Sequence, residues 1–113
     1  MLDDITSVTL QTAIGGLSRR QDATANNIAN TETPHFTASQ VSFESSLADA
    51  VANGNPAAAQ VSVDPTSDAA GANGNNVSLD REFVDATKTT LQLQMLTQAL
   101  TARYSQLATV LKG

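Results

Sequence analysis

The strongest pattern in the sequence is a seven-residue repeat near its C-terminal end. Ten positions alternate strictly by four and three residues, and eight of the ten are apolar: Leu79, Phe83, Ala86, Thr90, Leu93, Thr97, Leu100, Tyr104, Leu107 and Leu111. A repeat kept over this length is typical of a helix that packs along a coiled-coil seam. We therefore predict a long heptad helix over residues 78–113, with Ser78 as its N-cap.

A second helical period occupies the N-terminal end. Its positions are spaced by four, three, seven and four residues: Leu10, Ile14, Leu17, Thr24 and Ile28. This spacing predicts a helix over residues 1–30. Gly15 and Gly16 weaken it and predict a kink or fraying there. Pro34 places the end of the helix near Asn30, because the residue before a proline disfavours the α conformation.

The middle of the chain, residues 31–77, differs from both ends. Between residues 52 and 76, 21 of 25 residues are Gly, Ala, Pro, Asn, Ser or Asp, and only Val61 and Val63 are larger apolar residues. Such a segment buries too little apolar surface to offset its ordering entropy, so we predict a flexible polar linker. Ahead of it, residues 40–44 alternate and predict a short strand or extended segment. Residues 45–51 predict one or two helical turns.

These three zones predict an all-α fold. The N- and C-terminal helices form a helical hairpin or coiled coil, and the middle segment with its linker is largely irregular or disordered. The C-terminal helix also carries apolar residues off its seam: Leu91, Met95, Leu96, Ala99, Ala102 and Val110. Two interpretations of this surplus stay open. It either thickens the core of a simple hairpin or meets other chains.

Composition and charge exclude several classes of partner and site. Six basic residues against eleven acidic ones give a net charge of −5, and the longest basic run is Arg19–Arg20, so we expect no nucleic-acid partner. The absence of Cys removes disulfides, thiolate catalysis and Cys-based zinc sites. No run approaches the roughly 20 apolar residues of a membrane span, so we expect no direct membrane insertion. The N-terminal segment, with acids at Asp3 and Asp4, does not resemble a cleaved Sec-type signal peptide.

The sequence offers little for catalysis or metal binding. Its one histidine, His35, lies in a predicted turn, and no nearby acid is spaced to form a tuned acid–base pair with it. Asp3 and Asp4 are adjacent, so their side chains point in different directions and make a poor metal site. We therefore expect no enzyme activity, no cofactor and no metal site.

Two asparagine-rich segments border the predicted helices. The first runs from Asn26 through Pro34, and the second leads through Asn76 into the C-terminal helix. They resemble the two signatures of flagellar basal-body rod proteins and related axial proteins. That family usually has Gly and Tyr after the proline, where this chain has His35 and Phe36; Gly adopts positive φ freely, whereas His does so at a cost. The residues matching the family motif are Asn26, Asn27, Ile28, Ala29, Asn30, Thr33, Pro34, Asn76, Val77, Leu79, Asp80 and Glu82.

The resemblance implies a structural subunit of the proximal rod of the bacterial flagellum. It implies export by the flagellar type III apparatus without a cleaved signal peptide, and a place in the periplasmic rod of the basal body. Its terminal helices would assemble with other copies of itself and with other rod and basal-body proteins, and so transmit torque. From the periodic positions, the candidate residues for helix packing and assembly are Leu10, Leu17, Ile28, Leu79, Phe83, Leu93, Leu100, Tyr104, Leu107 and Leu111.

Three alternatives stay open at this point. The chain is either this subunit or another rod paralogue, which differs in its neighbours and not in its chemistry. A secreted helical-hairpin interaction protein of the Trp-x-Gly type has a similar length and no Cys, but the absence of Trp argues against it. An enzyme would have to depend on His35, so His35→Ala would have to abolish its activity.

Overall fold

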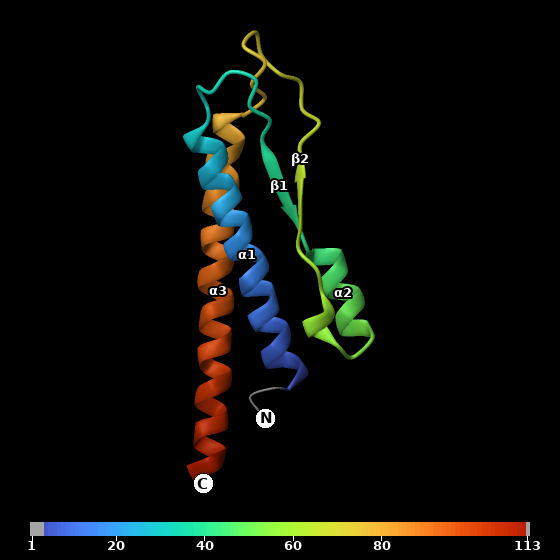
Figure 1. The fold of residues 1–113 in the computed structure, drawn as a ribbon. Helices are drawn as coiled ribbons and strands as arrows, with labels where there is room; N and C mark the ends of the chain where they lie inside the picture. Colours follow the sequence, from blue (N-terminus) through green and yellow to red (C-terminus); the bar gives the residue numbers. More distant parts are fainter. Residues whose placement is uncertain (1–3, 113) are drawn as a thin grey trace.

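The computed structural model describes residues 4–112 and shows an elongated molecule of 64 × 26 × 14 Å (Figure 1). Two long helices, α1 (Ile5–Ala29) and α3 (Leu79–Lys112), run antiparallel. Between them in the chain lie β1 (Ser39–Ser42), α2 (Glu44–Ala52), the 3₁₀ turn η1 (Pro56–Ala58) and β2 (Ser62–Pro65). Residues 1–3, which include Asp3 and the start of the predicted first helix, and residue 113 lie outside the described part.

The two terminal helices form the predicted hairpin. The side chain of Asp4 caps α1 by accepting a hydrogen bond from the Ser7 N–H at 2.7 Å. Ser78 precedes α3, and its Oγ accepts a long hydrogen bond of 3.4 Å from the Arg81 N–H. α1 is one continuous helix through Gly15 and Gly16, where the sequence predicted a kink or fraying. The tertiary packing described below outweighs the low helix propensity of glycine.

The middle segment departs from the all-α prediction. β1 and β2 form a two-stranded antiparallel sheet in which Val41 lies opposite Val63 and Ser42 opposite Ser62. The fold is therefore mostly helical but not purely all-α. All four residues of β2 are exposed, so the strand is held by backbone pairing with β1 and not by buried side chains. Because backbone pairing requires no apolar side chains, the polar composition of this segment gave no sign of the strand and predicted a linker instead.

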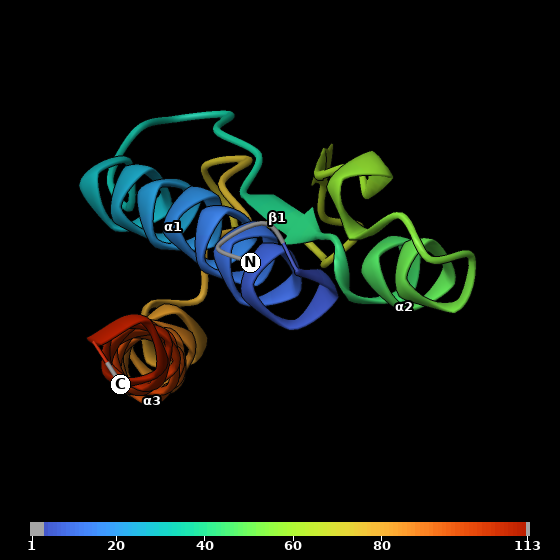
Figure 2. The same cartoon turned by 90° about the horizontal axis from the view of Figure 1, so that it is seen from below.

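The core lies where the middle segment packs on α1. Leu17 of α1 forms a buried cluster with Val41, Phe43 and Leu47, and Leu93 and Leu96 of α3 pack against it, along with smaller side chains. Side chains of a strand alternate between its faces, which turns Val41 inward and Ser42 outward. Seen along the long axis, α2 and α3 lie on either side of α1 (Figure 2). The middle segment thus supplies three of the four cluster residues.

Gly16 lets the middle segment approach α1 closely. A Cβ built at position 16 would lie 2.6 Å from the ring of Phe43, closer than real Cβ contacts allow. The Arg20 guanidinium lies over the same ring, 5.0 Å from its centroid, and donates hydrogen bonds to the Val41 carbonyl at 2.7 Å and to Glu44 at 2.6 Å. Glycine at position 16 therefore serves packing between segments.

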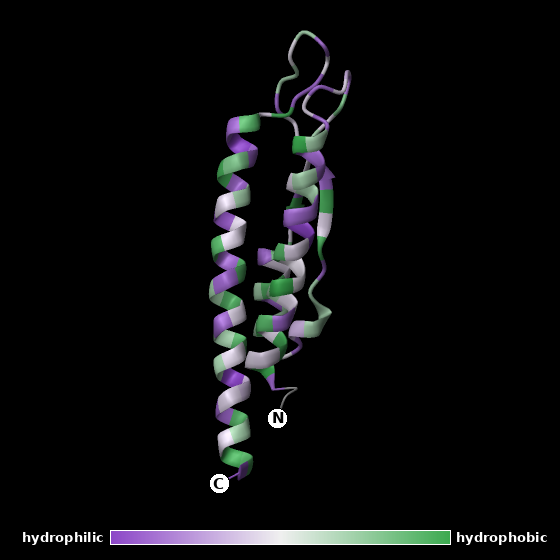
Figure 3. Ribbon diagram, turned by 90° about the vertical axis from the view of Figure 1, so that its left-hand side faces the viewer, coloured by the Kyte–Doolittle hydropathy of each residue, from purple (hydrophilic) through white to green (hydrophobic). Residues whose placement is uncertain are grey.

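The buried edge of α3 is more polar than the heptad count suggests. Glu82 and Thr89 are 7% and 1% exposed, whereas Phe83, one residue further along, is 54% exposed and Thr90 is exposed as well. Apolar segments recur along α3 in Figure 3, and several of its large apolar side chains face solvent: Leu79, Phe83, Val84, Leu91, Met95, Val110 and Leu111. One face of α3 is covered by α1, and much of the remaining apolar surface is left exposed.

Candidate functional site

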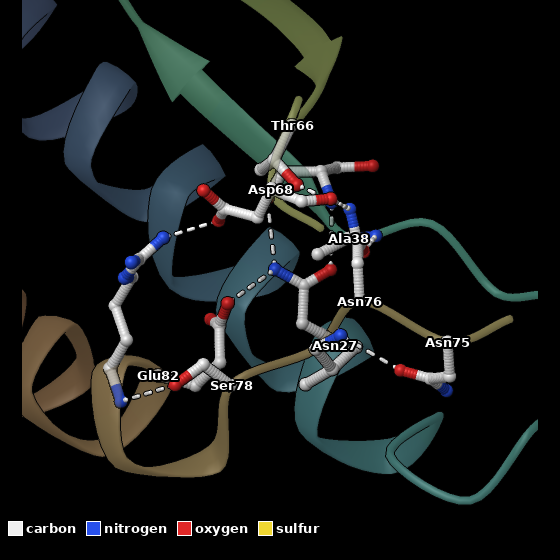
Figure 4. Close-up of polar contacts among 11 residues, drawn as sticks. Asn27, Ala38, Thr66, Asp68, Asn75, Asn76, Ser78 and Glu82 are labelled. Atoms are coloured by element: carbon white, nitrogen blue, oxygen red, sulfur yellow. Dashed lines mark hydrogen bonds and ion pairs between the residues drawn. The ribbon is translucent and has the colours of Figure 1, made fainter. Parts of the chain in front are cut away.

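The two asparagine-rich segments meet where α1 ends and α3 begins. Three buried or half-buried asparagines, Asn27, Asn75 and Asn76, connect these helix ends to the loops and to β1 (Figure 4). We call this set, together with Glu82, the asparagine junction. An amide side chain has two donor hydrogens and an accepting oxygen, so one asparagine can join several backbone segments.

Asn27 joins three elements with one side chain. It is 1% exposed, and its Nδ2 donates to the Ser39 carbonyl at 2.8 Å and to Glu82 Oε1 at 3.1 Å. Its Oδ1 accepts from the Ser39 N–H at 2.9 Å. Because the Ser39 N–H can only donate, it fixes the orientation of the amide. α1, the first residue of β1 and the first turn of α3 are therefore held at one point.

Glu82 is a buried carboxylate in the first turn of α3. Burial raises the pKa of this side chain above its ordinary value, and the negative charge of Asp85 adds to the effect. The hydrogen bond from Asn27 and the charge of Arg81 lower the same pKa, but burial outweighs them. The carboxylate accepts from an amide inside the hairpin, where its role is to join two elements.

Asn75 closes the end of α1. It is 7% exposed, and its Nδ2 donates to the carbonyls of Asn30 and Thr33 at 2.8 and 2.7 Å. Its Oδ1 accepts from the Val77 N–H at 2.8 Å. The carbonyls of Asn30 and Thr33 lie beyond the last residue of α1 and have no donor within the helix. The Asn75 side chain, from the other segment, donates a hydrogen bond to each of them.

Asn76 holds the loop that leads into β1. Its Oδ1 accepts from the Ala38 N–H at 2.7 Å, and its Nδ2 donates to Thr66 Oγ1 at 2.9 Å and to the Asp68 carbonyl at 3.2 Å. The Asp68 carboxylate also forms an ion pair with Arg81 of α3. The end of the polar segment thus takes part in the junction through hydrogen bonds, which its composition did not indicate.

The turn after Pro34 adopts the backbone geometry that the family's glycine would favour. His35 has φ of 61°, in the left-handed region, and its N–H donates to the Asn73 carbonyl at 2.9 Å. Gly74 also has positive φ, 79°, and a Cβ there would overlap the His35 ring. The single histidine is therefore a turn residue stacked on a glycine of the opposite segment.

The structure distributes the predicted packing residues over three environments. Leu17 is buried in the core. Six others are half-buried: Leu10, Ile28, Leu93, Leu100, Tyr104 and Leu107. Three are exposed: Leu79, Phe83 and Leu111. Tyr104 accepts a hydrogen bond from the Gln11 amide through its hydroxyl, so it also makes a polar contact across the hairpin.

The family-motif residues divide in a similar way. Asn27 and Glu82 are buried. The half-buried ones are Ile28, Asn30, Asn76 and Val77, and the exposed ones are Asn26, Ala29, Thr33, Pro34, Leu79 and Asp80. Sequence reasoning missed Asn75 as a junction residue and Ser39 as the backbone partner of Asn27. Asn75 stands beside the matched Asn76, so a run of asparagines facing a second run was the available signal.

The open end of the hairpin has its own polar contact. Asp4 forms an ion pair with Arg103, and that interaction, with the hydrogen bond from the Ser7 backbone N–H, lowers the pKa of Asp4 to about 2. Among residues 4–112 no group of three or more His, Asp or Glu side chains could hold a metal ion. In the same range, none of the helices is long and apolar enough to cross a membrane.

Comparisons with known proteins agree with the family resemblance. The family model described as "Flagella basal body rod protein" matches residues 10–37. The flagellar basal body rod protein FlgB of Bacillus subtilis (strain 168) is 31% identical over 123 residues, which cover 95% of each chain. FlgB of Escherichia coli (strain K12) is 28% identical over 91% of this chain and 90% of its own. The chain belongs to the FlgB family of flagellar basal-body rod proteins.

Proposed function

We propose that the chain is a proximal-rod subunit that the flagellar type III apparatus exports and that assembles through α1 and α3 to transmit torque. The observation that carries this proposal is the asparagine junction. The single side chain of Asn27 bonds both β1 and α3 to α1, and Asn75 bonds the segment before α3 to the end of α1. A subunit under torque has to keep its helices at a fixed relative position, and a buried, satisfied hydrogen-bond network favours a single arrangement.

The exposed apolar side chains of α3 support assembly through this helix. Phe83, Leu91 and Met95 are 54%, 55% and 68% exposed, which is much apolar surface for a small chain to leave in water. Of the predicted packing residues, the half-buried Leu93 and Leu100 serve the hairpin itself. We assign the exposed Leu79, Phe83 and Leu111 to contacts with neighbouring subunits.

The partners that fit this role are other rod and basal-body proteins, further copies of the chain and, during export, the type III apparatus. We place the assembled chain in the periplasmic part of the basal body. We assign it no catalytic role, because His35 serves the turn after Pro34 and Glu82 bonds with Asn27. The net charge of −5 disfavours nucleic acid as a partner.

Deletion of the gene tests this proposal. The deletion strain should lose swimming and should lack complete rods when its basal bodies are inspected by electron microscopy. Expression of the parent chain from a plasmid should restore both. Normal swimming with complete rods in the deletion strain would overturn the proposed function.

A further inference from the structure

One tetrapeptide, Ala-Asn-Gly-Asn, occurs twice in the chain, at residues 52–55 and 72–75. The first copy ends α2, and the second lies in the loop before α3. An asparagine followed by glycine is prone to spontaneous deamidation, because glycine has no Cβ to hinder closure of the intermediate ring. Asn53 and Asn73 are both exposed, so access to water does not distinguish them. A difference in their reactivity within the folded chain therefore comes from the contacts that hold each copy.

Deamidation at such a site requires neither an enzyme nor a cofactor. The backbone nitrogen of the glycine gives up its proton and attacks the side-chain carbon Cγ of the asparagine, and the amide group leaves as ammonia. Water then opens the cyclic imide at either carbonyl and yields aspartate or isoaspartate, so an amide and water become a carboxylic acid and ammonia. The attack requires rotation of the peptide group between the two residues. Because this group is planar and moves as one unit, hydrogen bonds to its N–H and to its C=O both resist the rotation.

Three hydrogen bonds hold the reacting groups at Asn73. The Gly74 N–H donates to the Gly71 carbonyl at 3.0 Å, and the Asn73 carbonyl accepts from the His35 N–H at 2.9 Å. The Asn73 side chain is engaged as well, because its Oδ1 accepts from the Asn75 N–H at 3.1 Å. The His35 ring also packs against Gly74. Ring closure at Asn73 would therefore break three hydrogen bonds.

One hydrogen bond holds the corresponding groups at Asn53. The Gly54 N–H donates to the Val51 carbonyl at 2.9 Å. Within residues 4–112, neither the Asn53 carbonyl nor the Asn53 side chain has a hydrogen-bond partner. A Cβ at Gly54 would meet no atom within 4 Å beyond its two chain neighbours, so the surroundings leave room for the peptide to rotate.

We propose that Asn53 is a deamidation site of the folded chain and that the asparagine junction protects Asn73. Two additional hydrogen bonds have to open at Asn73, which should slow its reaction at least about ten-fold relative to Asn53. The protection depends on the junction because the Asn75 side chain ties this loop to the end of α1 through the Asn30 and Thr33 carbonyls. This inference is independent of the proposed rod function.

Conversion of Asn53 should loosen α2. Either product carries a negative charge at the C-terminal end of the helix, where the helix dipole disfavours an anion. Isoaspartate also lengthens the backbone inside the motif that ends α2, in which the Asn55 N–H donates to the Ala50 carbonyl at 2.8 Å. Because α2 supplies Leu47 to the core cluster, the modification changes an element on which the packing depends.

The two identical tetrapeptides allow a test within one sample. The full-length chain would be kept in warm, mildly alkaline buffer, folded in one sample and unfolded by urea in another, with circular dichroism to verify each state. Cleavage after acidic residues separates the two sites, since Asp64 and Asp68 lie between them, and mass spectrometry of the peptides gives the rate at each site. In the folded chain Asn53 should react at least about ten-fold faster than Asn73. In urea the two rates should be alike.

Two variants test the role of the junction. Asn75→Ala should raise the rate at Asn73 in the folded chain towards the rate of the same variant in urea, and should leave the rate at Asn53 unchanged. Asn55→Ala is the matched control, because it makes the same change in the first copy, where the side chain is exposed and forms no hydrogen bond within residues 4–112. It should leave the rate at Asn73 unchanged.

Equal rates at the two sites in the folded parent would overturn the proposal. So would a folded parent that stays intact at Asn53 while the sample in urea is converted there. If Asn75→Ala keeps its helix content and the rate at Asn73 does not rise, the junction does not protect that residue.

Discussion

Asn27 and Glu82 lie 55 positions apart in the sequence and share a buried hydrogen bond, from Asn27 Nδ2 to Glu82 Oε1 at 3.1 Å. Asn27 belongs to the signature that ends α1, and Glu82 belongs to the signature that begins α3. The two family signatures are therefore two halves of one structural unit. A change in either residue should affect the stability of both helix ends.

Asn27→Ala should lower the free energy of unfolding by about 3 kcal/mol, because it leaves the buried Glu82 carboxylate and the Ser39 backbone groups without their partner. Asn26→Ala is the matched control. Asn26 is exposed in the same turn, so its replacement should change the stability by less than about 0.5 kcal/mol. Urea unfolding followed by circular dichroism measures both values. Equal losses at the two positions would show that the junction contributes no particular stability.

Glu82→Gln should stabilise the chain near neutral pH. The raised pKa of Glu82 means that the folded chain holds this proton more tightly than the unfolded chain does. The contribution of Glu82 to the free energy of unfolding therefore falls as the pH rises from the ordinary value of 4.5 through the raised one. Glutamine keeps an acceptor for Asn27 without the buried charge. Parent and variant should unfold at similar urea concentrations below pH 4.5, and a variant weaker than the parent at neutral pH would contradict this explanation.

Asp4 should show the opposite pH dependence. Its interaction with Arg103 lowers its pKa from 3.8 to about 2, so it stabilises the folded chain above pH 3.8, and this contribution is lost as the pH falls towards 2. Asp4→Asn retains a good N-cap residue but removes the ion pair. The variant should therefore be less stable than the parent at neutral pH and equally stable near pH 2. Thermal unfolding at the two pH values would check this, and a difference independent of pH would exclude the ion pair as its source.

Gly16→Ala and Gly15→Ala should have opposite effects. A methyl group at position 16 meets the Phe43 ring, and this overpacking should cost about 2 kcal/mol. A methyl group at position 15 would meet no atom within 4 Å beyond its chain neighbours and the helix's own backbone, so alanine there should add about 1 kcal/mol through better helix propensity. The two variants have the same composition, which makes their difference in melting temperature a direct comparison. Stabilisation by both would mean that Phe43 does not pack against α1 as described.

Local sequence signals predicted the helices and β1 because each signal acts on its own segment. Pro34 and the asparagines before it mark the end of α1, and Ser78 marks the start of α3. The apolar residues at positions 41 and 43 indicated a strand with one inward face, and the structure buries both. Propensity and capping require no knowledge of the partner segment.

Apart from the hairpin of α1 and α3, the partnerships between segments could not be predicted in the same way. β2 pairs through its backbone, so its polar side chains carry no signal of the sheet. The inner edge of α3 includes Thr89, and a count of apolar positions passes over such a residue. Glu82 and Asn27 are polar residues whose burial depends on each other, and the sequence of one segment does not reveal the partner in the other.

Electron microscopy of basal bodies tests the central claim, that the asparagine junction holds the terminal helices in the arrangement from which the rod is built. The deletion strain would express either the parent or Asn27→Ala, with matched amounts of exported chain verified by immunoblot. We expect complete rods with the parent, and missing or truncated rods with Asn27→Ala despite normal export. Complete rods in parental numbers with Asn27→Ala would contradict the account, because the rod would then form without the bond that joins the two signatures.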